Sequence, residues 1–288
     1  MQDGVRLAAL GARRADPVLA DPRHRGARLV RRIRAVSFDA GGTLIGIAEP
    51  VGVTYARFAR AAGFPADADA LDEGFRRAFA TAPPLAPTAG HAATLLEFEL
   101  SWWRAIVAAS LGYALCEDVP PSRAGDLERF FAATFAWYAE PAAWRLLPDA
   151  AGAVRELDGR GLRLAVLSNF DRRLHGLIDA FGLCDAFSAI VPSSEAGAAK
   201  PARGAFDHVR RQLSGGGTLA AGECLHVGDS VREDVAGALG AGWRAVWIDR
   251  HGHGHGDGGS GSAATTGLPD GAARITTLHD LSSLAVSF

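Results

Sequence analysis

A chain of 288 residues, 48% of them hydrophobic and 22% charged, is long enough to bury one large domain or two modest ones. Its formal net charge of −2 excludes a general electrostatic attraction to nucleic acid, and no apolar run approaches the length that spans a membrane. The three cysteines are far apart and form no CxxC pair, which predicts buried thiols rather than disulfides or a zinc site. Such cysteine usage indicates an intracellular protein, cytoplasmic by default.

Residues 1–32 are rich in arginine and contain neither serine nor threonine. The segment lacks the long apolar stretch of a secretory signal, and it is unlike a typical organellar presequence. We expect a basic, disordered tail, and organellar targeting by this tail stays open.

The first predicted strand covers residues 33–38, an apolar run interrupted by Arg34. It ends at Asp39, and Gly41 and Gly42 then allow a tight turn and a close approach to a ligand. Taken alone, Asp39 could be a capping residue before a loop. It also lies where open α/β sheets bind their ligands, at the carboxyl end of a core strand.

Residues 48–147 predict a module of about four helices. The breaks between them fall at Gly63, at Pro83-Pro84 and at Pro120-Pro121. Aromatic side chains at helical spacing indicate the core of a bundle rather than a cofactor site; they include Phe75, Phe79, Trp102 and Phe135. We interpret the module as an insertion into another domain.

From Pro148 onward, helices alternate with apolar strands at residues 162–169, 187–192, 224–229 and 245–249, the last clear strand. This alternation predicts βαβ units and hence an α/β fold, a doubly wound parallel sheet that includes the strand at residues 33–38. The core would then comprise residues 33–47 and 148–288. Asp149 is expected to cap the first helix of its second part.

Residues 251–267 are a low-complexity stretch of glycine, histidine and serine. Three alternating histidines there could hold a soft metal ion. We favour a flexible insertion within the core, because this composition is typical of linkers.

Four chemically active side chains follow predicted strands. Asp39, Ser168 and Asp229 lie at strand ends, and Lys200, the only lysine of the chain, lies on the loop after another strand. The carboxyl ends of parallel strands meet at one edge, so these side chains should converge. Asp39 and Asp229 offer oxygen ligands for Mg²⁺, and Asp234, one helical turn on, can orient Lys200. The set predicts a phosphoryl-transfer site.

The same residues resemble the four motifs of the haloacid dehalogenase-like (HAD) hydrolase superfamily, in order and at plausible spacing. The motifs are Asp39 with Gly42-Thr43, Ser168-Asn169, Lys200-Pro201, and Gly228-Asp229-Ser230 with Asp234. The helical module is similar to the α-helical cap of the first subclass. The resemblance implies a Rossmannoid core and a cap that closes over a small phosphorylated metabolite.

The resemblance also implies a role for each matched residue. Asp39 would be the nucleophile that forms an aspartyl-phosphate and a ligand of Mg²⁺. The phosphate would be bound by Thr43, Ser168, Asn169 and Lys200, of which Ser168 and Lys200 are also catalytic. The metal shell would be completed by Asp229 and the backbone carbonyl of Gly41, with Asp234 supporting the metal and Lys200.

One position departs from the pattern of the superfamily's phosphatases, because Gly41 stands where they have a second Asp. That Asp protonates the leaving group, a contribution of about 10²–10⁴-fold in rate. The chain is then a weakened or specialised Mg²⁺-dependent hydrolase, or a catalytically silent protein that binds a phosphorylated ligand or a protein partner. A dehalogenase is a third reading, and Asp171 is a candidate for a substitute acid.

Overall fold

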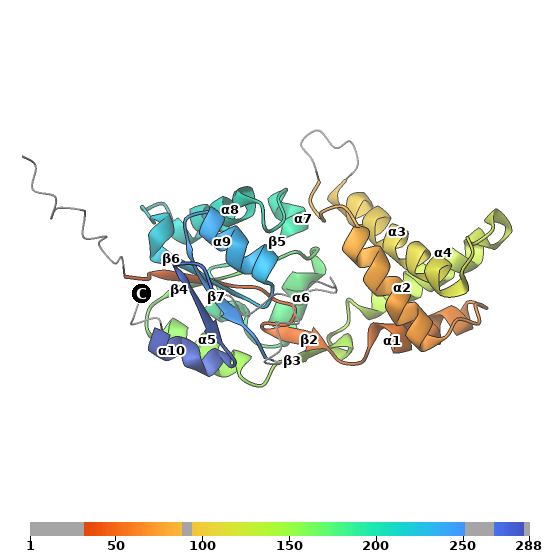
Figure 1. Cartoon of the computed structure of the whole chain (residues 1–288), viewed down its shortest axis with the longest axis horizontal. Helices are drawn as coiled ribbons and strands as arrows, with labels where there is room; N and C mark the ends of the chain where they lie inside the picture. Colours follow the sequence, from red (N-terminus) through yellow and green to blue (C-terminus); the bar gives the residue numbers. More distant parts are fainter. Residues whose placement is uncertain (1–31, 88–93, 251–267, 285–288) are drawn as a thin grey trace, which may run out of the picture. The chain divides into compact units, whose positions relative to one another are not determined.

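The computed structural model describes residues 32–87, 94–250 and 268–284 (Figure 1). The expected basic tail, apart from its last residue, and the whole stretch at residues 251–267 lie outside the described residues. In the part of the chain that is described, no helix is both long enough and apolar enough to cross a membrane.

The central sheet of the described chain has six parallel strands in the order β5-β4-β1-β6-β7-β8. The strands are β1 (Ala35–Phe38), β4 (Arg163–Ser168), β5 (Ala189–Pro192), β6 (Cys224–Gly228), β7 (Arg244–Ile248) and β8 (Ala272–Ile275). The predicted parallel α/β fold is confirmed, with β1 between β4 and β6. The last clear strand of the sequence, at residues 245–249, corresponds to β7, and β8, which the sequence did not predict, pairs with it at the edge of the sheet.

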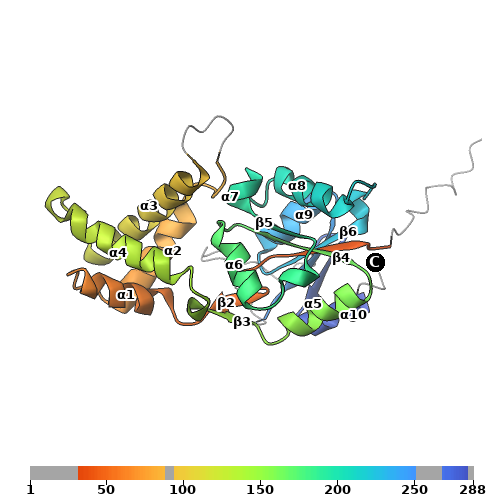
Figure 2. The ribbon, with the colours of Figure 1, turned by 180° about the vertical axis from the view of Figure 1, so that it is seen from behind.

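Helices cover both faces of this sheet, as Figures 1 and 2 show from opposite sides. One face carries α5 (Ala150–Gly159), α6 (Arg173–Ala180) and α10 (Leu281–Leu284), and the other carries α8 (Arg203–Ser214) and α9 (Gly237–Gly240). Strands covered on both sides must be apolar along their whole length, which explains the continuous apolar runs in the sequence. Short helical segments lie between these elements: η3 (Cys184–Ala186), α7 (Ser193–Ala196), η4 (Ala221–Glu223), the π-helix η5 (Val231–Ala236) and η6 (Leu278–Asp280).

A helical insertion separates two short antiparallel strands, β2 (Ile45–Ile47) and β3 (Trp144–Leu146). It consists of α1 (Val51–Ala61), α2 (Ala68–Thr81), α3 (Leu95–Leu115), η1 (Pro121–Arg123), α4 (Ala124–Trp137) and η2 (Pro141–Ala143). The α-helices fall where the sequence predicts them and enclose a hydrophobic cluster that includes Tyr55, Leu111 and Phe130. Neither β2 nor β3 was expected, because three residues are too few to show an alternating pattern.

Two smaller expectations are wrong. Asp149 makes no side-chain cap to α5. Its carboxylate instead accepts hydrogen bonds from Arg250, a stronger, charged donor, over 2.9 Å. The cysteines are free, and Cys224 is buried as expected, but Cys116 and Cys184 are exposed. Those two lie at the C-terminal end of α3 and in the short turn η3, where the chain meets solvent.

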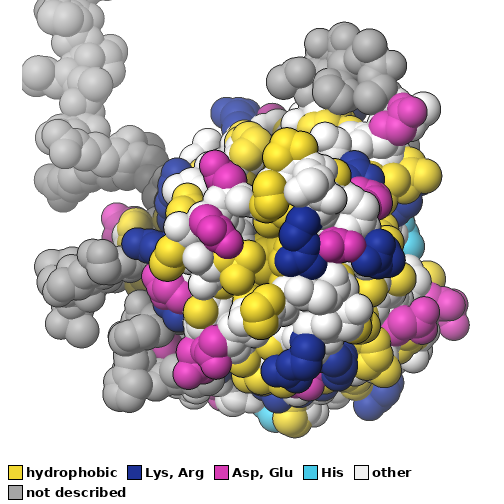
Figure 3. Space-filling view, turned by 90° about the vertical axis from the view of Figure 1, so that its right-hand side faces the viewer, with side chains coloured by type: hydrophobic (Ala, Val, Ile, Leu, Met, Phe, Trp, Pro, Cys, Tyr) yellow, Lys and Arg dark blue, Asp and Glu magenta, His cyan; other side chains and the backbone are white. Residues whose placement is uncertain are grey.

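Acidic and basic side chains are interspersed on the face drawn in Figure 3, with hydrophobic ones between them. A continuous stripe of basic side chains, of the kind that attracts nucleic acid, would appear there as a dark blue patch. The mixture on this face agrees with the formal net charge of −2.

Candidate active site

Asp39 is held in place by the sheet itself. Its backbone N–H donates to the carbonyl of Val227 on β6 over 2.8 Å, so the pairing of β1 with β6 continues up to this carboxylate. The following turn brings Gly42 against Asp229, with a φ of +75° at Gly42. A Cβ at Gly42 would lie 2.1 Å from Asp229 Oδ2, so the turn requires glycine for both its backbone angle and its space.

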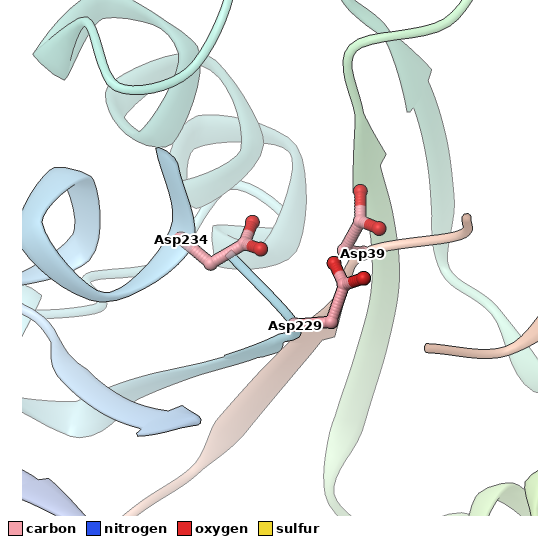
Figure 4. Close-up of side chains that lie close together, drawn as sticks. All are labelled: Asp39, Asp229 and Asp234. Atoms are coloured by element: carbon pink, nitrogen blue, oxygen red, sulfur yellow. The ribbon is translucent and has the colours of Figure 1, made fainter. Parts of the chain in front are cut away.

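Three carboxylates gather at this edge of the sheet (Figure 4). Asp39, Asp229 and Asp234 each offer an oxygen, and these oxygens lie within 4.8 Å of one another. Asp39 and Asp229 follow β1 and β6, whereas Asp234 lies in η5 and points toward them. Asp39 and Asp234 are buried and Asp229 is half-buried. Clustered carboxylate oxygens are the ligands that Mg²⁺ prefers, so the donor set fits that ion.

Lys200 places an ammonium among these carboxylates. Its Nζ donates to Asp39 Oδ1 over 2.6 Å and also to Asp234 Oδ1, and its side chain is 1% exposed. Burial favours the neutral amine, but Asp234 and Asp39 outweigh it and raise the pKa of Lys200 above its ordinary value. Lys200 is therefore charged.

The two carboxylates that share Lys200 respond in opposite directions. Burial raises the pKa of Asp39, because Lys200 offsets only part of the desolvation. Burial acts on Asp234 as well, but Lys200 and His226 outweigh it and hold the pKa of Asp234 below its usual range. A bound cation would offset the negative charge of the carboxylates around Asp39.

Asn169 fixes the backbone that carries Lys200. Its Oδ1 accepts from the Lys200 N–H over 2.8 Å, and its Nδ2 donates to the Lys200 carbonyl over 3.0 Å. The same Nδ2 donates to Glu233 Oε2 over 2.9 Å. These bonds give Asn169 a positioning role, and phosphate binding by its amide stays a prediction. Ser168, the last residue of β4, is buried at the edge of the pocket described below.

A buried polar chain lies behind the carboxylates, and the sequence reasoning missed it. Ser37 Oγ lies 2.7 Å from His226 Nδ1, and His226 Nε2 lies 2.9 Å from Asp234 Oδ1. Burial lowers the pKa of His226, so the ring is neutral and must donate from Nε2 to Asp234 while Nδ1 accepts from Ser37. The signal in the sequence is a histidine within the otherwise apolar strand CLHVG.

A pocket of about 420 Å³ opens onto these groups. The polar site at one end of it consists of Asp39, Ser168, Lys200, Asp229 and Asp234. An aromatic wall contributed by α2, α3 and α4 consists of Phe75, Phe79, Trp102, Trp103 and Phe135. The expectation that these aromatic side chains belong to the bundle core is therefore wrong for part of the set. Aromatic residues on one face of a helix can pack into the core or line the pocket, and helical spacing alone does not distinguish these two positions.

A family model described as "Hydrolase: haloacid dehalogenase-like hydrolase" matches residues 33–242. The chain belongs to this family. A haloacid dehalogenase-like hydrolase domain-containing protein 3 from Homo sapiens is 32% identical over 217 residues, 75% of this chain and 82% of the relative. The strings FDAGGTL, LSNFD, AKP and HVGDSVREDVAGA indicate the same branch of the HAD family.

Solved structures share the fold. An L-2-haloacid dehalogenase from Xanthobacter autotrophicus is similar with a TM-score of 0.61 and 21% identity, covering 89% of this chain and 99% of that one. A HAD phosphatase from Thermococcus onnurineus has a TM-score of 0.54 and 22% identity, with 88% and 97% covered. The HAD fold is thus common to proteins named for two different reactions, and it does not choose between them.

Gly41 lines the pocket, and an added Cβ there would meet no atom within 4 Å. The Cβ of an Asp at this position would therefore meet no steric conflict. Thr43, which the motif assigns to the phosphate, is fully buried and does not line the pocket. Its Oγ1 has no hydrogen-bond partner within the described residues.

The proposed substitute acid, Asp171, is fully buried and is engaged within the protein. Its carboxylate accepts from Arg173 over 2.6 and 2.9 Å and from Trp103 Nε1 over 2.6 Å. Glu233 lines the pocket and accepts from Asn169. Both carboxylates accept hydrogen bonds within the protein, and Asp171 does not line the pocket.

Proposed function

We propose that this chain is a Mg²⁺-dependent hydrolase that transfers a phosphoryl group from a small phosphorylated metabolite to Asp39. The observation that carries the proposal is the meeting of Asp39 with Lys200 and two further carboxylates beyond the end of β1. A carboxylate nucleophile, an ammonium and ligands for a hard cation are the groups that phosphoryl transfer requires.

Asp39 attacks phosphorus, the bond to the leaving-group oxygen breaks, and the electron pair goes to that oxygen. Lys200 and Ser168 bind the phosphoryl oxygens, and Asp234 holds Lys200 in place. Water then hydrolyses the aspartyl-phosphate, which releases phosphate and restores the carboxylate. Mg²⁺, held by Asp39, Asp229 and the carbonyl of Gly41, would offset the negative charge of the phosphoryl group.

Gly41 restricts which substrates can react. Without an acid at this position, the leaving group departs as an anion, and about 10²–10⁴-fold in rate is lost for a group that needs a proton. Aryl and acyl phosphates leave as stable anions. The proposed activity is therefore weak in general, or selective for phosphates of this kind.

The helical insertion acts in this proposal as the cap. Glu99 on α3 is fully buried and accepts from the backbone N–H and Nε of Arg172, over 3.2 and 2.7 Å, and from Ser194 Oγ over 2.7 Å. Trp103 Nε1 on the same helix donates to Asp171. These bonds join α3 to the segment that follows β4 and to α7, which follows β5.

A catalytically silent protein that binds a phosphorylated ligand or a protein partner is the second candidate. Gly41 favours it, because the position lacks the group that protonates the leaving oxygen. A dehalogenase has less support, since dehalogenases of this superfamily need no Mg²⁺ and this chain keeps Asp229 and Asp234 in an acidic cluster.

The test is release of inorganic phosphate from phenyl phosphate and acetyl phosphate, with Mg²⁺ or with EDTA. We expect turnover that EDTA abolishes and that Asp39→Asn lowers by at least about 10³-fold. Turnover that survives Asp39→Asn, or none in the wild-type chain, would reject the hydrolase. Calorimetry with the same compounds would then test the silent binder, and halide release from 2-haloacids without metal would support the dehalogenase.

A further inference from the structure

The far end of the pocket is built from aromatic rings that contact one another. Phe79 stacks on Phe75 at 5.5 Å between ring centroids and packs edge to face with Trp102 at 5.9 Å. Its ring is also tilted by 32° to that of Trp103, at 6.3 Å between centroids. The Phe79 side chain is 45% exposed, although its neighbours belong to a packed bundle. A large exposed ring on a pocket lining is a surface that an apolar ligand can cover.

The two indole N–H groups and the guanidinium group beside these rings are already bonded to the protein. Trp102 Nε1 donates to the carbonyl of Pro83 over 2.8 Å, and Trp103 Nε1 donates to Asp171. Arg173 pairs with Asp171 and donates to the carbonyl of Phe135 over 3.1 Å. A ligand rich in hydroxyls would lose its bonds to water at this wall and find these donors occupied.

We infer that the substrate is an aryl or aroyl phosphate, whose phosphoryl group lies in the polar site and whose ring lies against the aromatic wall. This inference rests on the proposed function and deepens it. The volume of about 420 Å³ lies within the range of pockets that enclose a small ligand. Offset or edge-to-face contacts with Phe79 and Trp102 are the geometry that aromatic ligands prefer.

The absence of an acid at Gly41 agrees with the same class of substrate. When Asp39 attacks phosphorus, a bond forms between its carboxylate oxygen and phosphorus and the bond to the leaving-group oxygen breaks. The electron pair of the broken bond stays on a phenolate or carboxylate oxygen. These anions are stabilised by resonance and take their proton from solvent after release. The aromatic wall and the missing acid are independent observations. The wall favours a leaving group that carries a ring, and the missing acid favours one that departs as a stable anion, and an aryl or aroyl phosphate meets both conditions.

The experiment compares benzoyl phosphate with acetyl phosphate in the presence of Mg²⁺. Both leave as carboxylates of similar acidity, so the comparison isolates the ring. We expect kcat/KM to be at least about 10-fold higher for benzoyl phosphate. Equal values, or a preference for acetyl phosphate, would overturn the inference while leaving the hydrolase intact.

Binding of phenylphosphonate and methylphosphonate, measured by calorimetry with Mg²⁺, separates this inference from the proposed function. Neither compound has a phosphate ester bond to hydrolyse, so the result does not depend on turnover. We expect at least about 10-fold tighter binding of phenylphosphonate. Equal affinity, or no binding of either compound, would overturn the inference whether or not the chain is a hydrolase.

Phe79→Ala provides the matched variant, because an exposed ring can be removed without opening the core. We expect it to lower the ratio of kcat/KM for benzoyl phosphate to that for acetyl phosphate by at least about 5-fold. Tyr113→Ala is the control: Tyr113 is 46% exposed on α3 and lies outside the pocket lining. The inference fails if the two variants give the same ratio.

Discussion

The two ends of the pocket differ in what holds them together. At the polar site, Lys200 and the carboxylates of Asp39 and Asp234 fix one another through buried ion pairs, and the sheet fixes the backbone beneath them. At the aromatic wall, rings from α2, α3 and α4 contact each other and leave Phe79 partly exposed. In the proposed hydrolase, the chemistry of the reaction and the choice of substrate would therefore depend on separate parts of the chain, so one could change without the other.

The largest expected loss of stability comes from a substitution that disrupts the polar site. Lys200→Met leaves Asp39 and Asp234 buried without a countercharge, and we expect the free energy of unfolding to fall by about 3–5 kcal/mol. Phe79→Ala, at the wall, removes a half-exposed ring and should cost less than about 1 kcal/mol. Urea unfolding at pH 7 measures both.

Arg203→Met is the control for Lys200→Met, because its side chain is 68% exposed and its ion pair with Asp207 lies on the surface. We expect a change within about 0.5 kcal/mol. If Phe79→Ala were as destabilising as Lys200→Met, the two ends of the pocket would not differ in the way described.

The next effect concerns the support of the turn after Asp39. Arg250 donates to the carbonyls of Gly42 and Thr43, over 3.1 and 2.8 Å, and is itself held by Asp149. Asp149 also accepts from the backbone N–H of Leu278 over 2.7 Å. Asp149→Asn weakens these charged bonds, and we expect a loss of about 2 kcal/mol in the free energy of unfolding at pH 7.

This loss should depend on pH with a definite sign. Burial would raise the pKa of Asp149, but the bonds from Arg250 and the Leu278 N–H outweigh it and hold the pKa below its ordinary value. A depressed pKa stabilises the fold above the unfolded pKa, about 3.9, and this stabilisation disappears as pH falls through the folded value. Urea unfolding from pH 7 to pH 3 should show a constant difference between Asp149→Asn and the parent above about pH 5, which shrinks below that. A difference that grows toward low pH would contradict it.

Gly41→Asp tests whether proton transfer is what the polar site lacks. The position has open space, and we expect kcat/KM for an alkyl phosphate to rise at least ~10-fold. Acetyl phosphate should gain less, because its leaving group needs no proton. Gly41→Asn fills the same space without a titratable proton and serves as the control. Should both variants leave the rate unchanged, the pocket rather than the acid would limit the reaction, and Glu233→Gln would show whether Glu233 already supplies the proton.

Much of the fold could be predicted because parallel strands buried on both faces are unbroken apolar runs. β8 was missed because its sequence, AARI, is short and weakly apolar and includes an arginine. Asp39, Lys200 and Asp229 were found because strand ends of one sheet converge by topology, and Asp234 because it lies one helical turn beyond Asp229. Asn169 was assigned to the phosphate from its place beside Ser168, yet its partners Lys200 and Glu233 lie 31 and 64 positions away.

The aromatic wall could not be predicted in the same way. Helical spacing shows which residues share a face, but Phe130 is buried in the bundle while Phe79, on another helix of the insertion, lines the pocket. Which part of a face meets the core depends on how the helices pack, and that information is not local. The role of His226 could be predicted only in part. A histidine in an apolar strand indicates a buried polar partner but does not identify that partner as Asp234.

The smallest expected effect concerns Thr43, whose buried Oγ1 has no partner within the described residues. If this hydroxyl serves the phosphate, as the motif implies, Thr43→Val should lower kcat/KM by about 2- to 10-fold, the value of one hydrogen bond. The free energy of unfolding should change by less than about 0.5 kcal/mol or rise, because a methyl group replaces a buried hydroxyl that has no hydrogen-bond partner among the described residues. Thr43→Ser is the control that keeps the hydroxyl. A loss of stability in Thr43→Val with an unchanged rate would show that the hydroxyl supports the fold instead, and the polar site would then end at Asp39.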